Sequence, residues 1–130
     1  MKVATTLLLA VSFAATPALA HHSFAAQYDA NKPITLTGKV TKVEWMNPHV
    51  YFYVDVKDDK GAVTNWACET GGGPNSLIRQ GWTKDSLKVD DSVTVEGFLA
   101  KDGSKTANAR NVTLASTGKK MFAGTNEEKP

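Results

Sequence analysis

Cysteine and histidine are scarce in this chain of 130 residues, which has one cysteine and three histidines. The single cysteine, Cys68, excludes an intrachain disulfide. We expect its thiol to be buried, although a lone cysteine in an oxidising compartment could also be a soft metal ligand or an intermolecular bridge. No Ser-His-Asp or Cys-His set with a third orienting residue can be named. The sequence therefore contains no complete catalytic signature, and we expect a binding protein rather than an enzyme.

The chain also has little net charge, with 15 basic and 13 acidic residues. Lys2 is the only charged residue among positions 1–20, so residues 21–130 have 14 basic and 13 acidic side chains. This balance argues against a nucleic-acid partner, which usually requires a clear basic excess. It also argues against electrostatic attachment to an anionic membrane. No apolar run after residue 20 is long enough to cross a bilayer.

The first 20 residues have the pattern of a secretory signal peptide. Lys2 supplies the positive charge, residues 7–15 are almost entirely apolar, and a small-x-small sequence ends the segment. We expect cleavage at Ala20-His21 and a periplasmic or secreted product. An uncleaved membrane anchor is the alternative, but the apolar run is shorter than the roughly 20 residues that a span requires.

The rest of the chain divides into an N-terminal arm at residues 21–32, a β-rich domain at residues 33–122 and a disordered tail at residues 123–130. Alternating apolar and polar residues predict five strands in the domain. A short helix opened by Pro74 is expected after the third strand. The five strands are expected at residues 34–45, 49–57, 62–69, 93–99 and 106–114.

The first of these strands changes phase along its length. Apolar residues occupy even positions up to Val40 and odd positions at Val43 and Trp45. A slip of one residue predicts a β-bulge, which Gly38 would help to bend.

The order strand, strand, strand, helix, strand, strand is that of an OB-fold. We therefore expect an all-β protein, a small five-stranded OB-fold-like barrel with one short helix between the third and fourth strands. An open β-sandwich would show similar strand spacing and stays as the alternative.

Several short motifs together resemble a family of small exported bacterial proteins of unknown function. The resemblance implies a periplasmic OB-type domain and no assigned activity. Two positions depart from the expected pattern: Asp90, where a turn glycine is expected, and Cys68, where an ordinary apolar residue is expected. The motifs that carry the resemblance are His21-His22-Ser23-Phe24, Asn47-Pro48-His49, Asn65-Trp66-Ala67, Gly73-Pro74-Asn75 and Gly81-Trp82.

The three histidines form a candidate metal site. Cleavage before His21 would expose an α-amine beside its imidazole, and the two nitrogens can chelate one ion. His22 and His49 are the further candidate ligands, and nitrogen sites of this kind bind copper(II) most tightly among divalent first-row metals. The alternative is that His21 and His22 merely follow a cleavage site, while His49 bonds to the backbone in a turn.

An aromatic row offers a second candidate site. Trp45, Tyr51, Tyr53 and Trp66 could stack on a small molecule or a glycan, or contact a protein partner, on one face of the barrel. Cross-strand pairing and core filling would explain the same residues without a ligand. Our leading hypothesis is a monomeric, exported protein that binds copper(II) or another divalent metal. A metal-free binding module is the alternative, and a copper-dependent oxidoreductase is ranked last.

Overall fold

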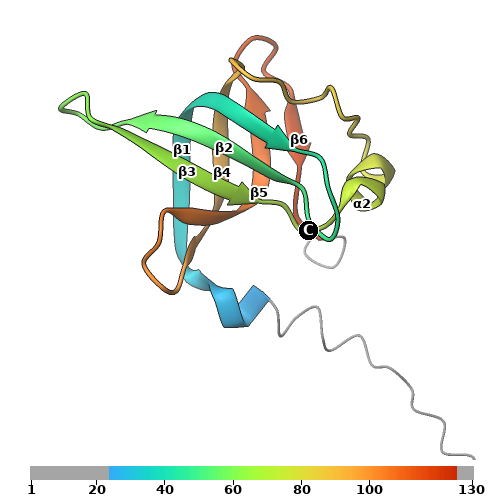
Figure 1. Ribbon diagram of the computed structural model, residues 1–130, viewed down its shortest axis with the longest axis horizontal. Coiled ribbons are helices and arrows are strands. Elements are labelled where there is room, and N and C mark those ends of the chain that lie inside the picture. Colours follow the sequence, from blue (N-terminus) through green and yellow to red (C-terminus); the bar gives the residue numbers. More distant parts are fainter. Residues whose placement is uncertain (1–23, 126–130) are drawn as a thin grey trace, which may run out of the picture.

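The computed structural model describes residues 24–125, which form a mostly β structure with few short helical segments (Figure 1). Six strands are present in the described part of the chain, where the sequence predicted five. The helix α2 (Pro74–Arg79) lies between the third and fourth strands, as predicted. No helix among residues 24–125 is both long and apolar enough to cross a membrane.

The strand β1 (Tyr28–Glu44) is the longest element and pairs with two neighbours. Its first part pairs antiparallel with β4 (Ser92–Ala100), and its second part pairs with β2 (Tyr51–Lys57). The β1–β2 register shifts between Val40 and Lys42, which confirms the predicted irregularity. Gly38 is required where the backbones approach, because a Cβ there would lie 1.9 Å from the carbonyl oxygen of Asp55.

The strands form one ring-like sheet (Figure 1). Its hydrogen-bonded order is β3-β2-β1-β4-β5-β6, with β3 at Val63–Glu69, β5 at Thr106–Leu114 and β6 at Lys120–Phe122. A parallel pairing of β3 with β5 brings the ring together. The sixth strand, β6, pairs with β5 at the end of the predicted β-rich domain, where no strand was expected.

The core fills the inside of this ring. Alternate residues of β2, Phe52 and Val54, are fully buried, while Tyr51 and Tyr53 face outward. The helix α2 adds Leu77, which is also fully buried. The core cluster comprises Leu36, Val40, Val50, Phe52, Val54, Trp66, Cys68, Leu77, Trp82, Leu87, Val93, Val95, Ala107, Ala109, Val112, Met121 and Ala123.

Candidate functional site

His49 lies just before β2, after an Asn47-Pro48 peptide that is cis. Its Nδ1 is 2.7 Å from the carbonyl oxygen of Thr70, which can only accept a hydrogen bond. The neutral tautomer therefore has its proton on Nδ1 and a free lone pair on Nε2. No residue among positions 24–125 is bonded to Nε2, and the side chain is 32% exposed. The ring is fixed in orientation and offers one nitrogen to a ligand.

Glu69, the last residue of β3, lies beside His49. One carboxylate oxygen, Oε1, is 3.2 Å from His49 Nδ1. The other, Oε2, accepts a hydrogen bond from the hydroxyl of Tyr28 at the start of β1. Glu69 is also directly opposite Tyr51 in the β2–β3 register. A carboxylate that is only 8% exposed is thus held among tyrosines from two other strands and one histidine.

The Glu69 carboxylate helps to raise the pKa values of Tyr28 and Tyr51. The pKa of Tyr28 lies far above its usual value because burial, the hydrogen bond to Glu69 and the charge of Glu69 all disfavour the phenolate. Burial and the same charge raise the pKa of Tyr51 to about 12. Both hydroxyls therefore remain protonated donors at neutral pH.

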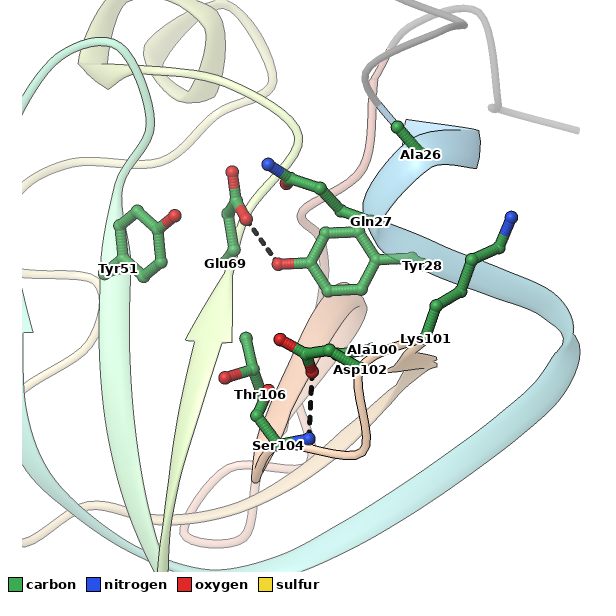
Figure 2. Close-up of a pocket in the computed structure, with 10 residues that line it drawn as sticks. All are labelled: Ala26, Gln27, Tyr28, Tyr51, Glu69, Ala100, Lys101, Asp102, Ser104 and Thr106. Carbon is green, nitrogen blue, oxygen red and sulfur yellow. Dashed lines mark hydrogen bonds between the residues drawn. The ribbon is translucent and has the colours of Figure 1, made fainter.

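A pocket of about 500 Å³ opens beside Glu69, and we call it the Glu69 pocket. Figure 2 shows the hydroxyl groups of Tyr28 and Tyr51 directed toward Glu69 from opposite sides. The other walls are the chain at Ala26 and Gln27 and the turn between β4 and β5, with Thr106 at the start of β5. The complete lining is Ala26, Gln27, Tyr28, Tyr51, Glu69, Ala100, Lys101, Asp102, Ser104 and Thr106.

The N-terminal wall is a helical turn at residues 24–27, which packs on the rest of the protein. The ring of Phe24 lies 5.8 Å from that of Tyr28 and 5.8 Å from that of Phe98. Lys101 donates through its backbone nitrogen to the carbonyl of Gln27 at 2.8 Å, and through Nζ to the carbonyl of Ala25. These contacts fix the turn against the β4–β5 end of the ring (Figure 1).

The structure separates the residues of the predicted aromatic row. Tyr51 lines the Glu69 pocket, whereas Tyr53 lies further along the outer face of β2 and donates to Glu44 at 3.4 Å. Trp66 faces the opposite way and is buried in the core, and Trp45 packs partly buried against that core. Of the four residues, only Tyr51 lines the pocket.

Of the three predicted metal ligands, His49 alone lies within the described residues. His21 and His22 lie outside the described residues, so their positions remain predictions. Within residues 24–125 no group of three or more His, Cys, Asp or Glu side chains could hold a metal ion. Cys68 is fully buried, as expected, and burial raises the pKa of its thiol to about 12. A metal at His49 would therefore need donors from outside residues 24–125.

The sequence did not identify Glu69, Asp102 or Tyr28 as site residues. One signal was present: Glu69 is the only charged residue in β3 and stands at its end, after Ala67 and Cys68. A carboxylate in that position suggests a specific partner. The partner, Tyr28, comes from 41 residues earlier in the chain, so local patterns could not name it.

Comparison with known proteins gives a family and no activity. A search of curated proteins finds no match. A family model matches residues 9–109, which is most of the chain, including the resemblance motifs from His21 to Trp82. The chain belongs to DUF6152, a family of unknown function.

Proposed function

We propose that this protein is exported, is cleaved before His21, and binds a divalent transition metal, copper(II) foremost, between its new N-terminus and His49. The observation that carries the proposal is the bond from His49 Nδ1 to the Thr70 carbonyl, at 2.7 Å. Histidines that bind metals commonly donate their other ring nitrogen to a carbonyl or a carboxylate, which fixes the tautomer and raises ligand basicity. His49 has both kinds of partner, since Glu69 Oε1 is 3.2 Å from the same nitrogen.

The remaining donors come from the first two residues of the processed chain. The α-amine and imidazole of His21 form a chelate, and His22 supplies a further nitrogen. An all-nitrogen set of this kind favours copper(II) over zinc(II) or nickel(II) by the usual order of affinity. The affinity falls at acid pH, because the amine (pKa about 7.7–8.0) and the imidazoles must lose protons to bind.

The contacts around Glu69 support the proposal that the processed N-terminus can reach His49. Gln27 lines the same pocket as Glu69, and Glu69 contacts His49, so the N-terminal turn and His49 approach one carboxylate from two sides. His21 precedes Phe24 by three residues, which can span roughly 10 Å when extended. Ordering each of these residues costs about 1–2 kcal/mol, which metal binding has to offset.

We also infer that the ring of strands is an OB-type barrel. The parallel β3–β5 pairing closes strands β1 to β5 on themselves, and α2 lies between β3 and β4. Both features are typical of that fold. The inference concerns architecture alone, because OB-type barrels have many unrelated functions.

The metal-free binding module has its own supporting observation, the Glu69 pocket of about 500 Å³. This volume is within the range of about 300–1,000 Å³ typical of small-molecule sites. The support comes from the pocket and from Tyr51, not from the aromatic row as a whole, because Trp66 is in the core.

Copper(II) titration of the processed protein tests the metal proposal. The matched control is the same protein with its α-amine acetylated, which removes one donor and leaves every side chain unchanged. We expect tight binding of one equivalent by the free-amine form, and weakening of at least tenfold, about 1.4 kcal/mol, on acetylation and in His49→Ala. Electron paramagnetic resonance of the copper(II) complex should show coupling to nitrogen ligands, and this coupling should decrease in the acetylated protein and in His49→Ala.

Two results would refute the proposal. The first is an affinity that neither acetylation nor His49→Ala changes, with circular dichroism confirming that both proteins are folded. The second is mass spectrometry of the exported product showing a start other than His21. Comparison of His22→Ala with His49→Ala then separates the contributions of these two imidazoles.

A further inference from the structure

The Glu69 pocket combines two carboxylates with two aromatic rings. Glu69 lies at its inner end and is 8% exposed, whereas Asp102 is exposed, in the β4–β5 turn. The rings of Tyr28 and Tyr51 line the same space (Figure 2). The rest of the polar lining consists of Lys101 and of uncharged residues, Gln27 among them.

Two carboxylates line the pocket against a single cation, Lys101. Lys101 is the one basic residue among those that line it, and its Nζ is bonded to the carbonyl of Ala25. Figure 2 shows this amine directed away from Glu69 and Asp102. Hydrogen bonding with the Ser104 side chain, and then with the Ser104 backbone nitrogen at 2.9 Å, lowers the pKa of Asp102.

Both tyrosine hydroxyls are directed toward Glu69. The Tyr28 hydroxyl donates to Glu69 Oε2, and the Tyr51 hydroxyl approaches from the other side (Figure 2). Among residues 24–125, His49 is the only ionisable base in contact with Glu69, and it is charged only if it is protonated. A positive ligand group would therefore enter a space lined by two carboxylates and two aromatic rings, with the Lys101 amine directed away from both carboxylates.

We propose that the Glu69 pocket binds a small organic ammonium compound, with one ammonium group directed toward Glu69 and the Asp102 carboxylate interacting with a second positive or hydroxyl group. Aromatic rings attract ammonium groups through their electron-rich faces, and Tyr28 and Tyr51 place such rings beside the carboxylate. This site uses no metal and no residue before Ala26. It therefore stands whether or not the copper proposal is correct.

Isothermal titration of metal-free, EDTA-dialysed full-length protein with 1,4-diaminobutane tests the proposal. Butane-1,4-diol is the matched neutral probe, because it has the same length and hydrogen-bonding ends without the charges. We expect saturable binding of the diamine, at least tenfold weaker binding of the diol, and an affinity for the diamine that falls with added salt.

Two variants and a control locate the site. Asp102→Asn should weaken diamine binding about five- to tenfold, because it removes one exposed charge. Glu69→Gln keeps an acceptor for Tyr28 and should weaken binding further, because that charge is buried. Asp58→Asn is the control, since Asp58 also accepts backbone bonds in a turn, between β2 and β3, but does not line the pocket.

The proposal is overturned if the diamine shows no saturable binding, or if the diol or a neutral sugar binds as tightly. It is also overturned if Asp102→Asn binds the diamine no more weakly than Asp58→Asn does. Because Asp102 is exposed and its replacement keeps the side-chain shape, this comparison remains decisive even if Glu69→Gln fails to fold.

Discussion

Replacement of Tyr28 by phenylalanine tests how the Glu69 carboxylate is held. The change removes only the hydroxyl group that donates to Glu69 Oε2. Tyr28 is 4% exposed and Glu69 is 8% exposed, so bulk water has little access to the position that the hydroxyl leaves. The carboxylate would lose a donor that water cannot readily replace.

A hydrogen bond to a charged group contributes about 1.5–3 kcal/mol, and we expect Tyr28→Phe to lower the free energy of unfolding by this amount. Tyr51→Phe is the matched control, because its hydroxyl faces the same carboxylate from a more exposed position. Water can partly replace that hydroxyl, so the expected loss is about 0.5–1.5 kcal/mol. In a domain of this size each kcal/mol shifts the Tm by about 4–8 °C.

Urea unfolding at neutral pH, followed by tryptophan fluorescence, measures both losses from the transition midpoint at an unchanged m value. The same pair of measurements in a Glu69→Gln background gives the coupling energy between each tyrosine and the carboxylate. Equal losses in the free energy of unfolding for Tyr28→Phe and Tyr51→Phe would refute the claim that the buried Tyr28 hydroxyl is the more important donor to Glu69. A Tyr28→Phe loss that Glu69→Gln does not reduce would refute it as well.

Three further predictions concern the core, the backbone and alkaline pH. The Cys68 thiol should react with a thiol reagent only as the protein unfolds, because it is fully buried and its pKa is raised to about 12. The reaction can be followed by absorbance, and a rapid reaction of the native protein would contradict this prediction. Gly97→Ala should cost about 3 kcal/mol or more, because the new Cβ would lie 1.9 Å from the Asn108 carbonyl oxygen. Gly61→Ala, at φ +81° in open space, should cost only about 1–2 kcal/mol, and similar Tm values for these two variants would be inconsistent with the strand contact. The pKa of Tyr51 is about 12 in the folded protein and near 10 in the unfolded protein. The stabilising contribution of its protonated hydroxyl is therefore complete below pH 10 and decreases as the pH rises toward 12. Over this range the free energy of unfolding, measured by urea titration, should fall less steeply for Tyr51→Phe than for the unmodified protein.

Much of the strand pattern could be predicted from local sequence. The alternation in β2 puts Phe52 and Val54 on one face of the strand and Tyr51 and Tyr53 on the other, and the structure buries the first pair and leaves the second partly exposed. The change of phase between Val40 and Val43 correctly predicted the register shift in β1. Such patterns succeed because burial of one face requires apolar residues at every second position.

Other elements depend on contacts that the local pattern does not contain. The strand β1 begins at Tyr28, before the alternating segment, because pairing of Tyr28 with Ala100 and packing on Phe24 extend it. Similarly, β6 is only three residues long and exists through its pairing with β5. A short, isolated strand has no stability of its own.

The candidate site shows the same division. The sequence named His49 and Tyr51, because histidine and tyrosine are recognisable by their chemistry. It did not connect Glu69 to either residue, and it grouped Trp66 with Tyr51 although the two face opposite sides of the sheet. Only the register of β2 against β3 decides which residues share a face.

By itself, the amino-acid sequence determined that the chain is rich in strands, that a short helix opens at Pro74, and that its one thiol is buried. These properties follow from side-chain periodicity, proline geometry and the low polarity of cysteine. The tertiary structure alone decided that Glu69 is buried beside His49 and Tyr28, and that a pocket lies next to it. The physical reason is that burial of a charge requires donors from distant strands, and strand pairing is what brings those donors together.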